Sequence, residues 1–159
     1  MTDAQEQNVL VIERVFNAPV DRVWDAWTDP EKMKIWTGPK GFTAPVIKQD
    51  FRVGGKYLTC MQAPDGQRFW STGVYKEIIE HEKIVATDSF ADEDGNVVNP
   101  TDIGMPADFP REMLLTVLFE ALPDGNTKLT IRQEGMPASI AKDAHADWNG
   151  SLDKLEALL

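Results

Sequence analysis

Residues 15–42 read VFNAPVDRVWDAWTDPEKMKIWTGPKGF and hold three of the five tryptophans of the chain. Pro19 has a fixed backbone angle that suits the first turn of a helix, so it marks a helix start. Four apolar residues follow at the spacing of a single helix face, namely Val20, Val23, Trp24 and Trp27. The pattern predicts a short amphipathic helix whose two tryptophans are seated on the core.

A second helix start follows at Asp29, which suits the N-cap, with Pro30 in the first helical position. Met33 and Trp36 share one face of this helix, and the Gly-Pro pair after Thr37 ends it. Trp36 therefore lies where the chain must bend. Two positions stay open for its indole, one in the core and one at the rim of a ligand pocket.

On both sides of these helices the sequence has the period of strands. VLVIERVF (9–16) precedes the helices, and about six strands follow from residue 44 onwards, separated by turn signals such as the Pro-Asp-Gly words at 64–66 and 123–125. A meander of antiparallel strands is the simplest arrangement. Residues 91–110 are rich in acidic residues, proline and glycine, which predicts a loop without regular structure.

The chain ends in a long amphipathic pattern that opens at Pro137. Its apolar residues recur at spacings of three and four, namely Ile140, Ala144, Trp148, Leu152, Leu155 and Leu159. About twenty residues at about 1.5 Å each form a helix long enough to cross a curved sheet. The order of elements predicts an α+β fold in a single domain over residues 1–159, with 1–8 as a loose tail.

Composition excludes several classes of function. The net charge of -10 opposes binding to nucleic acid and to anionic membranes. Neither a membrane-spanning run nor a signal peptide is visible, so a cytoplasmic location is expected. Cys60 is the single cysteine and only His81 and His145 accompany it, so no disulfide, metal site or other cofactor is expected. We expect Cys60 to be a buried, unreactive thiol.

A set of motifs in this chain resembles the SRPBCC or START-like superfamily of helix-grip proteins. Within it, the chain is similar to the bacterial homologues of the activator of the ninety-kilodalton heat-shock-protein ATPase. The motifs are RVFNAPVDRVWDAWTDPEKMKIW, GPKGFTAPV, DFRVGGKY, PDGQ, GVYKEI, FADEDGNVVNP, LTVLFE, TKLTI and WNGSLDKL. Two positions depart from the family pattern, because Thr37 replaces a second tryptophan after Trp36 and Asp147 replaces a glycine before Trp148.

The resemblance implies a seven-stranded curved antiparallel sheet wrapped around the long C-terminal helix, with two short helices after the first strand. It also implies an apolar pocket between sheet and helix, which in many members of the superfamily holds a hydrophobic small molecule. The first hypothesis is therefore binding of a small hydrophobic or aromatic molecule. An enzyme of cyclase, hydratase or dehydratase type in the same pocket and a chaperone-associated ATPase activator in the stress response remain as alternatives. A monomer and a homodimer are both open.

Strand alternation selects the side chains that face the pocket. With the rim and the last helix added, the predicted ligand-binding residues are Arg14, Trp36, Phe42, Tyr57, Thr59, Met61, Phe69, Tyr75, Phe90, Leu115, Val117, Trp148 and Leu152. Trp70 falls on the outer face unless a bulge reverses the register. No catalytic residue is assigned, because nucleophile motifs are absent and His145 has no carboxylate on its helix face to orient it.

Two charged residues share strand faces with apolar neighbours. Arg14 alternates with Ile12 and Phe16, and Asp88 lies on the face of Phe90. A buried charge is costly unless it is paired. Either the two meet inside the pocket, where they would orient a ligand, or each turns to the surface at a local irregularity.

Overall fold

The computed structural model describes residues 9–159, so the loose tail predicted for residues 1–8 lies outside the described residues. Strand β1 (Val9–Phe16) leads into helices α2 (Val20–Thr28) and α3 (Pro30–Trp36). Six strands follow: β2 (Thr43–Gln49), β3 (Lys56–Gln62), β4 (Arg68–Ile79), β5 (Lys83–Ala91), β6 (Met113–Ala121) and β7 (Thr127–Glu134). Helix α4 (Ala138–Leu158) ends the chain, and the predicted order of elements is confirmed.

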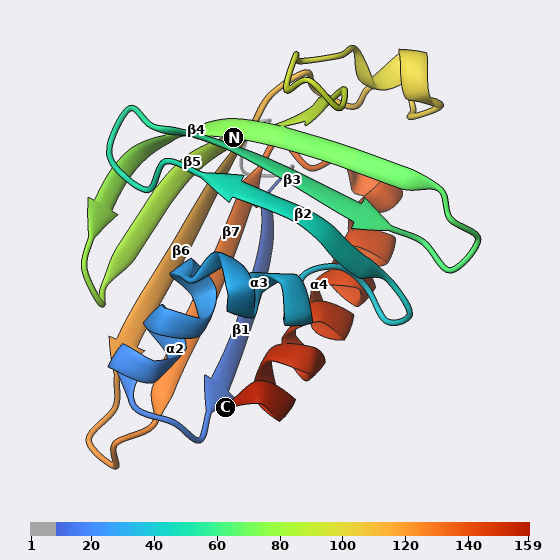
Figure 1. The fold of residues 1–159 in the computed structure, drawn as a ribbon. Helices are drawn as coiled ribbons and strands as arrows, with labels where there is room; N and C mark the ends of the chain where they lie inside the picture. Colours follow the sequence, from blue (N-terminus) through green and yellow to red (C-terminus); the bar gives the residue numbers. More distant parts are fainter. Residues whose placement is uncertain (1–8) are drawn as a thin grey trace, which may run out of the picture.

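The seven strands form one antiparallel sheet in the order β1-β7-β6-β5-β4-β3-β2. Consecutive strands pair from β2 to β7, as a meander requires, and β1 closes the other edge by pairing with β7. Figure 1 shows the sheet curving around α4, with α2 and α3 on the same side. The predicted helix-grip fold is confirmed. Within the described part of the chain, no helix is long and apolar enough to cross a membrane.

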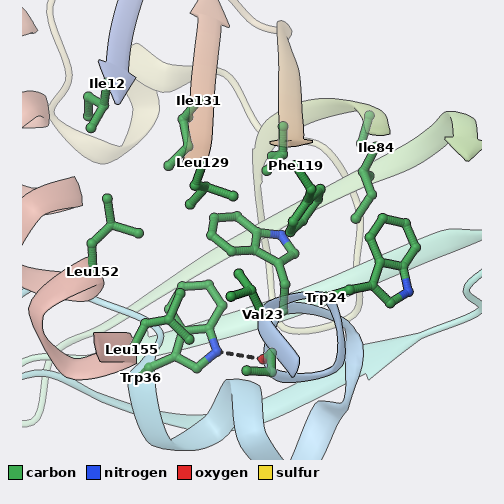
Figure 2. Close-up of a cluster of buried hydrophobic side chains, with 14 of the residues drawn as sticks. Ile12, Val23, Trp24, Trp36, Ile84, Phe119, Leu129, Ile131, Leu152 and Leu155 are labelled. Carbon is green, nitrogen blue, oxygen red and sulfur yellow. Dashed lines mark hydrogen bonds between the residues drawn. The ribbon is translucent and has the colours of Figure 1, made fainter. Parts of the chain in front are cut away.

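Alternation along the strands places apolar side chains on the concave face. In β7, Thr127, Leu129, Ile131 and Gln133 are buried, and the residues between them are more exposed. The same face of β6 buries Val117 and Phe119. Figure 2 shows how Leu129, Ile131 and Phe119 from these strands meet the side chains of α2 and α4. The core thus forms where the concave face meets the helices.

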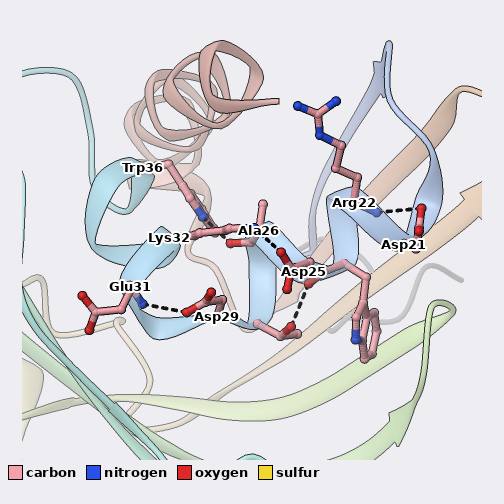
Figure 3. A network of polar contacts seen from close by, with 10 residues as sticks. Asp21, Arg22, Asp25, Ala26, Asp29, Glu31, Lys32 and Trp36 are labelled. Atoms are coloured by element: carbon pink, nitrogen blue, oxygen red, sulfur yellow. Dashed lines mark hydrogen bonds and ion pairs between the residues drawn. The ribbon is translucent and has the colours of Figure 1, made fainter.

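The junction of α2 and α3 explains the position of Trp36. The carbonyl of Ala26 would normally accept a hydrogen bond from the residue four positions later, but that residue is Pro30, which has no N–H. The indole N–H of Trp36 donates to this carbonyl instead, at 2.8 Å (Figures 2 and 3). Trp36 is only 3% exposed, so it belongs to the core and the alternative position at a pocket rim was wrong.

The predicted cap of α3 is confirmed. The Asp29 side chain accepts a hydrogen bond from the backbone N–H of Glu31, and Pro30 occupies the first helical position (Figure 3). The predicted core position of the two tryptophans of α2 is also confirmed, since Trp24 and Trp27 are 7% and 8% exposed. Both tryptophans pack against Phe119 and thereby hold α2 against the sheet.

The segment 91–110 is more ordered than the sequence predicts. It forms a bridge between Ala91 and Val97 and a short 3₁₀ helix, η1 (Pro100–Ile103). Phe109 is buried and its ring lies 5.1 Å from that of Phe90. Most of the segment is irregular, as its composition predicts, but Pro100 and Phe109 are buried and Met105 packs against the core, contacts that composition does not reveal.

We expect Trp36→Phe to destabilise the protein by about 1–3 kcal/mol, because it leaves the buried carbonyl of Ala26 without a donor. Urea unfolding measures the change. The matched control is Trp70→Phe, which makes the same change in a half-buried indole on the outer face of the sheet. Equal losses in the two variants would contradict the role given to the Trp36 N–H.

Candidate functional site

Helix α4 covers only part of the concave face. Its buried residues are Gly150, Ser151, Leu152 and Leu155, all in its second half. None of the residues from Ala138 to Asn149, which form the first half of α4, is fully buried. This first half nevertheless lies on the concave side of the sheet, as the second half does (Figure 1). Apolar groups are therefore left without full cover where α4 begins.

The inward side chains of the sheet divide in the same way. In the part beneath α2, α3 and the second half of α4, which we call the covered half, they are buried: Tyr75, Ile84, Ala86, Val117 and Phe119. Toward the end of the sheet where α4 begins, which we call the open half, they are half-buried: Thr59, Met61, Phe69, Ser71 and Phe90. The open half is the candidate site.

Trp148 stands at the boundary between the two halves. Its ring is nearly parallel to that of Trp27, at an interplanar angle of 12° and a centroid distance of 6.2 Å. Its indole N–H donates to Oε1 of Gln133 at 3.1 Å. The side chain is half-buried, so one part of it packs on the core and another part faces the open half.

A chain of polar side chains crosses the floor of the open half. Gln133 receives the Trp148 N–H and donates from Nε2 to Oδ2 of Asp88 at 3.1 Å. The other carboxyl oxygen of Asp88 lies 3.3 Å from the hydroxyl of Tyr57. The chain therefore joins α4, β7, β5 and β3, and Asp88 is its one acidic member.

Burial raises the pKa of Asp88, and its hydrogen bonds from Tyr57 and Gln133 oppose this only partly. Burial also raises the pKa of Tyr57 well above the usual value. The Tyr57 hydroxyl has a single proton, which it donates to the carbonyl of Thr87 at 2.8 Å. The same hydroxyl also lies 3.3 Å from Oδ1 of Asp88, to which it can direct this proton.

Gly73 explains how the Tyr57 ring reaches Asp88. It pairs with Tyr57 in the register of β3 and β4, and a Cβ atom at this position would lie 2.6 Å from Cε2 of Tyr57. The same Cβ would lie 1.9 Å from the carbonyl oxygen of Thr87. The ring thus crosses β4 at the one place where no side chain stands in its way.

A small cavity of about 90 Å³ lies beside this chain, in the covered half. Five predicted site residues line it: Tyr57, Thr59, Tyr75, Leu115 and Val117. Trp27, Met33, Gln49 and Phe51 also line it and were not predicted, because their elements meet the sheet only in the tertiary structure. Ligand pockets usually measure about 300–1,000 Å³, so this cavity alone is too small for a drug-sized ligand.

Arg14 and Asp88 do not meet, and neither turns to the surface, so both alternatives for this pair were wrong. The Arg14 guanidinium donates to Asp153 at 2.8 Å and to Asn149 at 3.2 Å, both on α4. Asp88 instead uses Tyr57 and Gln133. Strand parity gave the correct inward direction for both side chains, but it contains no information about α4.

The remaining predicted residues fall into two groups. Phe42 and Phe69 pack with ring centroids 6.1 Å apart, and Met61 is near them beside Gly38, all at the edge of the open half. The loop that carries Phe42 is held to α4 because the ammonium group of Lys154 donates to three of its carbonyls. Leu152 is fully buried in the core and does not line the cavity.

Three residues that were set aside lie where the sequence indicated. Cys60 is fully buried, and burial raises the pKa of its thiol. The register between β3 and β4 is unbroken, so Trp70 stays on the outer face. His145 is exposed, and its Nδ1 contacts the Asn149 amide at 3.0 Å.

We expect Asp88→Asn to stabilise the protein at pH 7 more than at pH 4. The pKa of Asp88 is higher in the folded state than in the unfolded chain, so as pH rises Asp88 ionises first in the unfolded chain. The free energy of unfolding of the wild type therefore falls until the pH has passed the folded-state pKa. Asparagine does not ionise, so it does not lose stability in this way, and its side-chain oxygen still accepts the hydrogen bond from Gln133. Urea unfolding of both proteins at several pH values measures the difference. A difference that does not depend on pH would contradict this account of the burial of Asp88.

We expect Gly73→Ala to lower the free energy of unfolding by about 1–3 kcal/mol, since the new methyl group overlaps Thr87 and Tyr57. A Gly→Ala change in an unstrained strand without this overlap would be neutral or stabilising. Ser71→Ala in the same strand is the control and should change stability far less. Thermal and urea unfolding provide the comparison, and a stable Gly73→Ala protein would show that the close packing of Tyr57 is not required.

Solved structures of bacterial proteins resemble this chain over nearly its whole length. Protein CV1439 from Chromobacterium violaceum is 34% identical, with a TM-score of 0.79 and 96% of each chain covered. Protein Ms6760 from Mycobacterium smegmatis is 26% identical, with a TM-score of 0.77, and the match covers 99% of this chain and 96% of that one. No curated protein matches the chain.

One family of sequences matches residues 17–159 and is described as Activator of Hsp90 ATPase homolog 1-like protein. The match includes both short helices, strands β2 to β7 and α4. It agrees with the resemblance that the sequence motifs indicated. The chain therefore belongs to the family of Activator of Hsp90 ATPase homolog 1-like proteins.

Proposed function

We propose that the protein binds a small, mostly apolar molecule in the open half, between the first half of α4 and strands β3 to β5. The polar chain from Tyr57 through Asp88 and Gln133 to Trp148 carries this proposal. It lies among half-buried apolar side chains, and its members are joined by hydrogen bonds, without which polar groups in such surroundings would be costly. A few such groups in an apolar setting are typical of sites that bind and orient a ligand.

The incomplete burial of the open half supports the same proposal. Phe69, Phe90 and Trp148 each retain some accessible surface. A ligand that covered them would gain about 25 cal/mol for each Å² of apolar surface removed from water. The small cavity beside Tyr57 and Leu115 adjoins this region and offers room for a side group of the ligand.

An enzyme of hydratase or dehydratase type is a second candidate, and Asp88 is the observation that favours it. A carboxyl group whose pKa is raised by burial is suited to donate a proton to a bound substrate. Tyr57 would orient that carboxyl group. Turnover that is lost in Asp88→Asn while ligand binding persists would favour the enzyme. The ATPase-activator hypothesis has the support of the family name alone.

A ligand screen with a blocked variant tests the binding proposal. Ser71 faces the open half and is half-buried, so Ser71→Phe should fill the space without disturbing the covered half. We expect small aromatic compounds to raise the melting temperature of the wild type and of Ser71→Ala. We expect them to have at least about tenfold weaker affinity for Ser71→Phe, since a ligand and the new ring cannot occupy one space.

The unfolding temperature of Ser71→Phe without ligand shows whether the variant is folded. Native mass spectrometry gives an independent count of bound molecules. The proposal is refuted if compounds bind Ser71→Phe as tightly as Ser71→Ala. It is also refuted if no compound in a broad apolar library raises the melting temperature of the wild type.

A further inference from the structure

Asp88 is a half-buried acid with which no basic side chain of residues 9–159 pairs. Among residues 9–159, the ion pairs of the protein do not include Asp88. Arg14, the basic residue whose strand parity also points inward, is held by Asp153 and Asn149. The two hydrogen bonds to Asp88 come from the uncharged groups of Tyr57 and Gln133. Its carboxylate could therefore pair with a positively charged group, which residues 9–159 do not supply.

The elements around Asp88 present no charge to it. Strand β3 presents Tyr57, β6 presents Met113 directly opposite in register, β7 presents Gln133, and α4 presents Trp148 through Gln133. Tyr57 is the titratable group in this set, and it keeps its proton because burial raises its pKa. An ionised Asp88 would consequently be an uncompensated charge in the empty protein.

We propose that the ligand of the open half is an organic cation, an amine or amidine with an aromatic or aliphatic body, whose charged nitrogen pairs with Asp88. This inference rests on the proposed binding function and specifies its ligand class. The apolar body then lies against Phe90 and Trp148, which are half-buried on the same side. Aromatic faces also attract cations, so the rings of Phe90 and Trp148 and the carboxylate of Asp88 favour the same kind of molecule.

The charge of the whole protein acts in the same direction. The net charge of -10 attracts cations and repels anions at long range. An anionic ligand would meet Asp88, and no basic group of residues 9–159 pairs with that acid to offset the repulsion. A neutral ligand would find hydrogen-bonding groups but would offer no charge to pair with an ionised Asp88.

Cation binding should be coupled to release of a proton from Asp88. A cation beside the carboxyl group favours its ionised form, whereas burial in the empty protein favours the protonated form. At a pH where the empty protein holds this proton, each bound cation displaces it, and affinity rises with pH. A role of Asp88 that is only structural would produce no such release.

A matched pair of probes tests the proposal, namely 1-naphthylmethylamine and 1-naphthylmethanol, which differ in the charged nitrogen and share the ring. We expect the wild type to bind the amine about tenfold or more tightly than the alcohol, as a desolvated ion pair provides. We expect Asp88→Asn to lose this preference while it still binds the alcohol. The control Glu120→Gln removes an exposed acid and should keep the preference.

Isothermal titration calorimetry in buffers with different ionisation enthalpies measures the released proton, which should be present for the amine and absent for the alcohol. Equal affinity for both probes, or a preference for the amine that persists in Asp88→Asn, overturns the inference and leaves the binding function intact. If neither probe binds the wild type, the open half is no site for small aromatic molecules, and the proposed function falls together with the inference.

Discussion

A curved sheet of seven strands has one long concave face, and the fold depends on how that face is covered. Helices α2 and α3 and the second half of α4 bury one half of it around Leu152 and Leu155. The first half of α4 contributes no fully buried residue. Because buried side chains cluster where helices and sheet touch, the other half of the face remains partly accessible. The position of the candidate site follows from this unequal cover.

The polar chain in the open half is held in place by specific contacts. Asp88 is in surroundings that disfavour its charge, yet two hydrogen bonds fix its direction. Gly73 gives the Tyr57 ring the space to reach it. Groups that lower stability and are nevertheless well oriented are expected at functional sites, since a purely structural core would use apolar residues of the same size.

Much of the fold is readable from local patterns, because the residues that decide it are neighbours in sequence. The period of β7 and the cap at Asp29 depend on spacing alone, and both are found as predicted. Trp36 and Phe109 show the limit of this method. The indole of Trp36 is buried because Pro30 leaves a carbonyl without its donor, and Phe109 returns to Phe90 across a long loop. Each outcome depends on a contact between separate elements.

The sequence by itself determined the order of strands and helices, the inward direction of Arg14, Tyr57 and Asp88, and the acidic charge, since all of these follow from composition and periodicity. The tertiary structure decided which of the inward groups meet. Arg14 pairs with α4, and Asp88 is left with two uncharged partners, because the direction of α4 across the sheet sets these distances. Strand parity fixes the face of a side chain, and only packing between distant elements fixes its neighbours.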